Sequence, residues 1–302
     1  MTERIRVGTR KSLLARAQTE LVLSQLRRVA PSWRFDPVPI DTSGDRDLSL
    51  GGSPDFTDAI DRALQKGDID LAVHSAKDLP VELDRRFEVV AYPRRADPRD
   101  CLVVARPLRP TRLPRGSRVG SSSLRRRAQL LRWRPDLTVV EIRGNVDTRI
   151  GLVRSGSIDA AVLAVAGISR LGRAGEIGRT LPSTRFVPSP GQGALAVVAR
   201  SGDAGLARSV QPIEQTVTRA CVTAERRFAA ILGGDCQAPL GALATVRGRT
   251  LQLVGEVLSP DGRSRLRARR TGPIGAPDRL GSELGQQLLT LGAPELWASA
   301  RR

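Results

Sequence analysis

The sequence has very few aromatic residues: phenylalanine, tryptophan and tyrosine together make up 3% of its 302 residues. Proteins that bind single-stranded nucleic acid without sequence preference stack bases on aromatic side chains, so this composition argues against that class of protein. The chain also lacks an apolar run long enough to cross a bilayer, since the longest one spans only residues 160–168. We therefore expect a soluble, cytoplasmic protein with no membrane or nucleic-acid partner.

Histidine and cysteine, the usual ligands of zinc, are also scarce. His74 is the single histidine, and the three cysteines, Cys101, Cys221 and Cys236, include no Cys-x-x-Cys pair. An odd number of cysteines without paired spacing argues against a disulfide framework and against a thiolate zinc site. We therefore predict reduced cysteines and no metal centre.

Positive charge is abundant and is carried almost entirely by arginine. The chain has 49 lysines and arginines against 31 aspartates and glutamates, a formal net charge of +18, and its only lysines are Lys11, Lys66 and Lys77. A general bias towards arginine explains this excess as well as a function does. If the excess is functional, forked guanidinium groups bind carboxylates and phosphates bidentately, so the partner is acidic.

Short β-branched apolar runs alternate with amphipathic helical patterns through the first two thirds of the chain, which predicts an α/β fold. We expect a strand at 4–10 and then a helix capped by Ser12. The predicted apolar face of this helix holds Leu14, Ala17, Leu21 and Leu26. A helix at 56–67 and a buried strand at 68–75 follow. Lys77 and Asp78 would lie just past the carboxyl end of that strand, where ligands bind in open α/β sheets.

The same pattern repeats from about residue 97. Strand, turn and helix are expected within 117–135, within 137–156 and within 159–172, and each junction carries serine or arginine, which suits an anion-lined cleft. The stretch 186–200 would lead the chain back to the first unit. Its GQGALA has the letters of a dinucleotide-binding fingerprint, but that fingerprint requires a helix after the glycines, and here a strand is expected. A helix at 214–232, two strand-like segments and a helix near 277–291 predict a smaller third domain.

The stretch LAVHSAKDLP at 71–80 holds three candidate residues, each with a plainer structural reading. His74 is either an acid–base group or a hydrogen-bonded structural residue in a buried strand. Lys77 and Asp78 are either part of a surface turn before Pro80, or charges that would be costly to bury without a use.

Two further motifs can be read in two ways. The run SSSLRRR at 121–127 is either a solvated helix start or an anion site; arginines in a first turn oppose the helix dipole, which favours an anion there. Cys236, in GGDCQAP, is either a small buried hydrophobe or an exposed thiol on a turn. With positive neighbours, an exposed thiol is a plausible point of covalent attachment.

Taken together, these stretches resemble the hydroxymethylbilane synthase family, also called the porphobilinogen deaminase family. The resemblance covers nearly the whole chain and rests on nine motifs in the family's order: VGTRKSLLARAQ, DLAVHSAKDLP, DPRDCLVV, VGSSSLRRRAQL, IRGNVDTR, AVLAVAGISRLG, GQGALAV, TAERRF and DCQAPLGA. It implies an α/β fold of three domains, the first two like type II periplasmic binding proteins around a central cleft. The expected domains are 1–95 plus about 193–212, 96–192, and 213–302, of which the last carries the cofactor cysteine.

The resemblance implies a transferase of tetrapyrrole (haem and porphyrin) biosynthesis. Such enzymes hold a dipyrromethane cofactor, expected here as a thioether on Cys236. Four porphobilinogen molecules add to it head to tail with loss of ammonia, and water then releases linear 1-hydroxymethylbilane. The family also implies a monomer whose product passes to the next enzyme of the pathway.

The motifs also assign roles to residues. Asp78 is expected to be the catalytic carboxylate, stabilising positive charge on pyrrole nitrogens and moving protons, with His74 as scaffolding beside it. The residues expected to hold the cofactor's carboxylates are Lys77, Ser123, Arg125 and Arg126. Those expected to meet substrate and growing chain are Arg10, Ser12, Arg143, Arg149, Arg170 and Gln192.

Two positions depart from the family's pattern. Relatives often carry lysines in a loop over the cleft, whereas this chain has Ser53 and Asp58 there, so lysine contacts are not expected. Asp235 precedes the cysteine where glycine is usual; because aspartate tolerates left-handed backbone better than most residues, we expect the turn to persist.

Two other functions compete with the transferase. A non-catalytic anion-binding module of periplasmic-binding-like fold would keep the arginines but release no ammonia from porphobilinogen. A nucleic-acid binder would show a steep salt dependence of its affinity for DNA, although the few aromatics and the ordered motifs argue against it.

Overall fold

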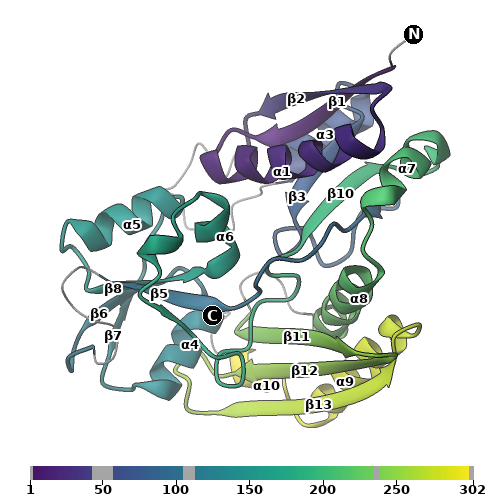
Figure 1. Cartoon of the computed structure of the whole chain (residues 1–302). Helices are drawn as coiled ribbons and strands as arrows, with labels where there is room; N and C mark the ends of the chain where they lie inside the picture. Colours follow the sequence, from purple (N-terminus) through teal and green to yellow (C-terminus); the bar gives the residue numbers. More distant parts are fainter. Residues whose placement is uncertain (1–2, 43–56, 105–112, 234–237, 299–302) are drawn as a thin grey trace. The chain divides into compact units, whose positions relative to one another are not determined.

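The structure is a computed structural model that describes residues 3–42, 57–104, 113–233 and 238–298. The chain divides into two compact units, whose helices and strands are labelled in Figure 1. Unit 1 comprises Met1–Ala96 and Ala194–Arg219, and unit 2 comprises Asp97–Gly193 and Ala220–Arg302. The three-domain boundaries expected from the sequence are a finer division and stay a prediction.

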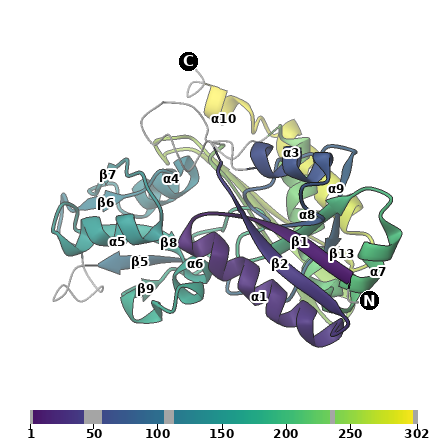
Figure 2. The ribbon, with the colours of Figure 1, turned by 90° about the horizontal axis from the view of Figure 1, so that it is seen from above.

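Unit 1 is built on a five-stranded sheet of order β2-β1-β3-β10-β4. Its strands are β1 (Glu3–Arg10), β2 (Trp33–Ile40), β3 (Leu71–Ser75), β4 (Phe87–Ala91) and β10 (Leu195–Arg200). β1 runs parallel to β2 and β3, whereas β10 is antiparallel to both of its neighbours. In Figures 1 and 2 helix α1 (Leu13–Val29) lies along β1 and β2.

The predicted cap of α1 is confirmed, but its predicted apolar face is partly wrong. The Ala15 N–H donates to Ser12 Oγ at 3.3 Å. Leu21, expected on the buried face, is 45% exposed. The buried residues are Ala15, Gln18, Thr19, Val22, Leu23 and Leu26. The stripe that packs on the sheet includes two polar residues, and for that reason a purely hydrophobic pattern passes over it.

Helices cover both faces of the sheet of unit 1. Val7 packs in the core that includes residues of α1 and of α7 (Ala204–Val210), which continues as a 3₁₀ turn, Gln211–Ile213. Its neighbour Gly8 points the other way, since successive residues of a strand alternate between faces. A Cβ at Gly8 would lie 3.6 Å from Ile60 of α3 (Asp58–Lys66). This helix therefore covers the opposite face.

Unit 2 repeats this arrangement in a sheet of order β7-β6-β8-β5-β9. Its strands are β5 (Asp100–Val104), β6 (Arg118–Gly120), β7 (Thr138–Val140), β8 (Ala160–Ala164) and β9 (Arg179–Thr180). As with β10 in unit 1, the fourth strand in order, β5, is antiparallel to both neighbours. Helix α4 (Leu124–Trp133) lies on one face, and α5 (Val146–Arg154) and α6 (Val165–Arg170) lie on the other (Figure 1). A 3₁₀ turn, Ala174–Glu176, precedes β9.

Unit 2 also holds an antiparallel three-stranded sheet of β11 (Leu240–Arg247), β12 (Thr250–Leu258) and β13 (Arg265–Pro273). Helices α8 (Thr216–Ile231) and α9 (Pro277–Thr290) pack on one face through Phe228 and Leu284, and α10 (Glu295–Ala298) follows. A Cβ on Gly255 would lie 2.4 Å from the Phe228 ring, so only glycine fits there. The sequence predicted two strand-like segments in this part of the chain, and the structure has three strands.

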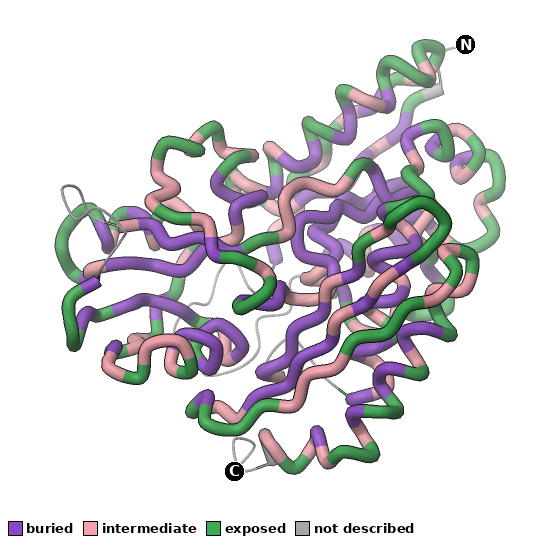
Figure 3. Tube along the Cα trace, turned by 60° about the horizontal axis from the view of Figure 1, so that its bottom comes forward, coloured by how far each residue is buried: buried purple, intermediate pink, exposed green. Residues whose placement is uncertain are grey.

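The α/β class is confirmed, and the helices and strands that were predicted occur in the predicted order. Figure 3 shows that the buried stretches mainly follow the strands, whereas the outward turns of the helices are exposed. No helix in the described part of the chain is long and apolar enough to span a membrane.

Candidate functional site

The carboxyl ends of β1 and β3 bring several predicted residues of unit 1 to one edge of the sheet. The two strands are parallel, with Val7 opposite Leu71 and Gly8 opposite Ala72. Arg10 ends β1, and Ser12 caps the following helix. All five residues of β3 are buried, as predicted, and the chain turns directly after them.

Lys77 and Asp78 lie half-buried in the turn that follows β3. The Asp78 N–H donates to the Ser75 carbonyl at 2.9 Å, which fixes the backbone of the turn. Within residues 3–42, 57–104, 113–233 and 238–298 the carboxylate of Asp78 has no hydrogen bond or ion pair. A half-buried carboxylate at the carboxyl end of a strand, with no partner in the described part of the chain, can bind and stabilise a cation.

His74 lies one strand position before this turn and is 5% exposed. Among the described residues its Nε2 atom has no hydrogen-bond partner. Burial, and secondarily the positive charge of Arg10, lower the pKa of His74 to about 4. The imidazole is therefore neutral at pH 7, and its pKa is too low for an efficient general base there. Its scaffolding role stays a prediction.

A fully buried carboxylate, Asp100, organises the arginines of unit 2. Its side chain is 0% exposed and pairs with Arg125 Nη1 at 2.7 Å and with Arg126 Nη2 at 2.8 Å. Arg126 Nε and Gln192 Nε2 donate two further bonds, at 3.1 and 2.9 Å. Burial alone would raise the pKa of Asp100, but the positive charges of both arginines and these hydrogen bonds hold it well below its usual range.

Arg125 is the most enclosed of these arginines, being 3% exposed. Besides Asp100, its Nη1 donates to Gln129 Oε1 at 3.0 Å and to the Val187 carbonyl at 2.9 Å. Burial lowers its pKa from the ordinary arginine value. Gln129 in turn donates to Glu256 Oε1 of β12 at 2.9 Å, so a buried polar chain connects α4 with the three-stranded sheet.

Arg126 and Ser123 lie at the start of α4, as predicted. Ser123 caps the helix and accepts from the Arg126 N–H at 3.4 Å. The Arg126 guanidinium donates to Asp100, to the Val162 carbonyl at 3.1 Å and to Gln192 Oε1 at 3.3 Å. These bonds fix the planar side chain in one orientation.

Two more predicted arginines, Arg149 and Arg170, are half-buried. Burial, the charge of Arg126 and the charge of Arg143 together lower the pKa of Arg149 to about 10. Burial lowers the pKa of Arg170 to about 10. They donate to the carbonyls of Gly144 at 2.9 Å and Gly193 at 2.7 Å, respectively. Neither pairs with a carboxylate among the described residues.

These groups form what we call the arginine cluster: Asp100, Arg125, Arg126, Arg149, Arg170 and Gln192. Its positive charges outnumber the single carboxylate within it, and an enclosed surplus of cations favours the binding of anions. Arg143 stands outside the cluster, paired on the surface with Glu141 at 2.7 Å.

The sequence analysis did not identify two residues of this region: Asp100, which belongs to the arginine cluster, and Gln129, which accepts a hydrogen bond from Arg125. A signal for Asp100 existed, since an aspartate opens the buried run DCLVV and a buried acid requires a cationic partner. No comparable signal marked Gln129, because its role depends on Glu256, far away in the chain.

Several predicted residues lie outside the described part of the chain, namely Ser53, Asp235 and Cys236. Asp58 starts α3 and pairs with Arg62 at 2.6 Å. The other two cysteines, Cys101 and Cys221, are buried, and burial raises the pKa of Cys101 to about 12. Such thiols are poor nucleophiles. The described residues contain no cluster of potential metal ligands.

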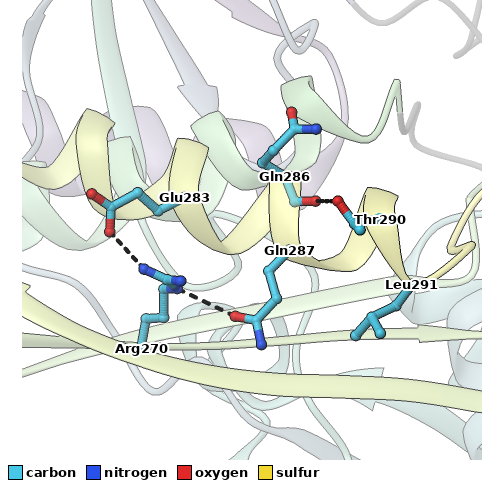
Figure 4. Close-up of a pocket in the computed structure, with 6 residues that line it drawn as sticks. All are labelled: Arg270, Glu283, Gln286, Gln287, Thr290 and Leu291. Atoms are coloured by element: carbon cyan, nitrogen blue, oxygen red, sulfur yellow. Dashed lines mark hydrogen bonds and ion pairs between the residues drawn. The ribbon is translucent and has the colours of Figure 1, made fainter.

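A pocket of about 500 Å³ lies between β13 and α9, and none of the residues that line it is a predicted site residue (Figure 4). Its one arginine, Arg270, is already bonded to Glu283 at 2.8 Å and Gln287 at 3.2 Å. We therefore do not assign it the chemistry of the arginine cluster.

Comparison with known proteins gives matches along almost the whole chain. The family model "Porphobilinogen deaminase, dipyromethane cofactor binding domain" matches residues 5–208, and the model "Porphobilinogen deaminase, C-terminal domain" matches residues 219–290. The porphobilinogen deaminase of Roseiflexus castenholzii is 43% identical, over 99% of this chain and 100% of that protein. That of Stenotrophomonas maltophilia K279a is 43% identical, over 97% and 99% respectively. The solved methionine-binding protein MetQ is 16% identical, covers 70% of this chain and 89% of its own, and has a TM-score of 0.46.

Proposed function

This chain belongs to the porphobilinogen deaminase family, and from that membership we propose how its residues carry out the family's reaction. The protein is a hydroxymethylbilane synthase, a transferase with a dipyrromethane cofactor-binding domain. In each addition the aminomethyl carbon of porphobilinogen loses ammonia and bonds to a pyrrole ring carbon. That ring carbon loses a proton, so one C–N and one C–H bond are replaced by one C–C bond and ammonia.

The observation that supports the residue assignments best is the surplus of positive charge in the arginine cluster. Every pyrrole ring of this chemistry carries an acetate and a propionate group, and enclosed guanidinium groups bind carboxylates strongly. Arg149 and Arg170 have no carboxylate partner among the described residues. The donor set therefore fits the dipyrromethane cofactor and its extensions.

We assign the cofactor's carboxylates to Lys77, Ser123, Arg125 and Arg126, and its thioether attachment to Cys236. When bound, dipyrromethane supplies the ring carbon that the first porphobilinogen joins. Arg125 is enclosed by Asp100, Gln129 and Val187, so we assign its contribution to charge rather than direct contact. The residues assigned to substrate and growing chain are Arg10, Ser12, Arg143, Arg149, Arg170 and Gln192.

Asp78 is the proposed catalytic residue. Departure of ammonia leaves positive charge on the substrate's pyrrole ring, and a nearby carboxylate lowers the energy of that state. The carboxylate of Asp78 also accepts a hydrogen bond from a pyrrole N–H and can take up a proton. We further propose that the enzyme is a cytoplasmic monomer whose product passes to the next tetrapyrrole enzyme.

The test of this role is ammonia release from porphobilinogen by wild type and by Asp78→Asn. We expect the variant to lose about 100-fold or more in kcat, the usual effect of removing a group that stabilises charge or moves a proton. Asp84→Asn is the matched control, because Asp84 is an aspartate of unit 1 bonded to Arg86 on the surface; its kcat should not change. Asp78→Asn activity within a few-fold of wild type would remove Asp78 from the mechanism. A wild-type protein that binds porphobilinogen without releasing ammonia would indicate the anion-binding module instead.

A further inference from the structure

Glu225, in the TAERRF motif, is a buried carboxylate that the proposed function does not use. It lies in α8 and is 0% exposed. Its Oε2 atom accepts the Gly191 N–H at 2.7 Å, and its Oε1 atom accepts the Ala244 N–H at 2.7 Å. Burying a carboxylate is costly unless it is well hydrogen-bonded. These short charge-assisted bonds therefore hold three separate segments together: α8, β11 and the chain at 191.

Residues 191–193, which we call the GQG turn, connect Glu225 to the arginine cluster. Gly191 and Gly193 have φ values of 72° and 85°, a left-handed conformation that favours glycine. Glu225 holds the N–H at the start of the turn, and Arg170 donates to the Gly193 carbonyl at its end, at 2.7 Å. The turn is thus bonded at both ends by charged groups.

Between the two glycines, Gln192 points into the cluster and is 1% exposed. Its Nε2 atom donates to Asp100 Oδ1 at 2.9 Å and to the Pro98 carbonyl at 2.7 Å. Its Oε1 atom accepts from Arg126 Nη2 at 3.3 Å. The position of this amide depends on the backbone of the GQG turn, and the orientation of Arg126 depends in part on this amide.

We propose that Glu225 is a positioning residue for the transferase reaction, acting through the GQG turn on Gln192 and Arg170. This inference rests on the proposed function, in which those two residues meet the carboxylates of substrate and growing chain. Because Glu225 is 0% exposed, we assign it no direct contact with substrate. Its carboxylate is required because both of its oxygens accept from backbone N–H groups, and an amide offers only one oxygen acceptor.

The test is Glu225→Gln, which keeps the side-chain volume but turns an NH₂ group towards one of the two backbone donors. We expect KM for porphobilinogen to rise about tenfold, the effect of losing one hydrogen bond to a charged group. We expect kcat to change less than about threefold, because Asp78 is untouched. The control is Glu214→Gln, because Glu214 is likewise a carboxylate that accepts a backbone N–H, that of Tyr92 at 2.7 Å, but its described hydrogen bonds all lie within unit 1. Its KM should stay at the wild-type value.

A double-mutant cycle with Gln192→Ala separates positioning from general destabilisation. If Glu225 acts through Gln192, Glu225→Gln raises KM clearly less in the Gln192→Ala background than in wild type. An unchanged KM in Glu225→Gln, or effects of the two substitutions that simply multiply, would overturn the proposal.

Hydrogen exchange at the Gly191 amide tests the structural step without any activity, so it stands even if wild type releases no ammonia and the proposed function fails. We expect this amide to exchange on the order of 100-fold more slowly in wild type than in Glu225→Gln. If the variant does not fold, the exchange rate of the Gly191 amide in wild type is sufficient to test the proposal. Slow exchange supports it, and exchange at the rate of an unprotected turn contradicts it.

Discussion

Replacing Asp100 by asparagine removes one negative charge from the interior of unit 2 while leaving its shape unchanged. The carboxylate accepts two bonds from Arg126, one from Arg125 and one from Gln192, between 2.7 and 3.1 Å. In Asp100→Asn two guanidinium groups, 3% and 8% exposed at their side chains, would face each other without this counter-ion. The amide would also direct an NH₂ group at one of these donors.

The expected cost follows from that burial. Removing one partner of a buried ion pair destabilises a protein by about 3–5 kcal/mol, because an uncompensated charge remains inside. The matched control is Asp136→Asn in the same unit. Asp136 forms a bidentate pair with Arg134 at 2.6 Å, but the two side chains are 22% and 27% exposed. Because solvent screens this exposed pair, Asp136→Asn should cost much less stability than Asp100→Asn.

Urea unfolding of the three proteins, followed by circular dichroism, measures both costs as shifts of the midpoint at unchanged slope. Because the pKa of Asp100 is held well below its usual range, its stabilising contribution is complete above the unfolded pKa of about 3.9 and is lost only as the pH falls further. The difference between wild type and Asp100→Asn should therefore be constant from about pH 5 to 8. A loss below about 1 kcal/mol, or equal losses in both variants, would refute the idea that Asp100 balances the arginines.

Two further predictions concern Cys236 and His74. In intact-mass measurements the purified enzyme should be heavier than its sequence by one dipyrromethane. Cys236→Ala should lack this increase in mass, whereas Cys221→Ala, at a buried thiol, should keep it. An active wild-type enzyme without the added mass would contradict the attachment. Folding lowers the pKa of His74 to about 4. Between about pH 6.5 and 4 the unfolded state therefore binds more protons than the folded state. The free energy of unfolding should decrease by about 1.4 kcal/mol for each pH unit as the pH falls through this range. His74→Leu should lack this component, so parallel curves for the two proteins would count against it.

Local features of the sequence were sufficient to predict the positions of most candidate residues. The cap at Ser12, the buried strand before Lys77 and Asp78, and the helix start at Ser123 all follow from short patterns of apolar and polar residues, and the structure has each of them. Such patterns succeed because capping and strand burial depend on residues a few positions apart.

The interactions that join distant segments could not be predicted in this way. Asp100 meets Arg126 and Gln192 only because β5, α4 and the GQG turn converge in the folded chain. Leu21 was placed on the wrong face of α1 because the stripe that packs against the sheet includes the polar residues Gln18 and Thr19, which a hydrophobic pattern does not select. Pairing partners in tertiary structure carry no fixed spacing in sequence, so residue type alone does not identify them.

The near-absence of lysine from this chain has a physical use in the arginine cluster, whatever its origin. Arg126 donates from Nε and Nη2 to Asp100, from Nη1 to Val162 and from Nη2 to Gln192, a set of directions that one ammonium group cannot match. Enclosure also lowers the pKa of Arg149 and Arg170 to about 10, which leaves both fully charged at neutral pH. A lysine starts near 10.4, and the same burial would bring its pKa close to neutrality and weaken its hold on carboxylates. A site that must stay cationic while largely enclosed therefore requires arginine.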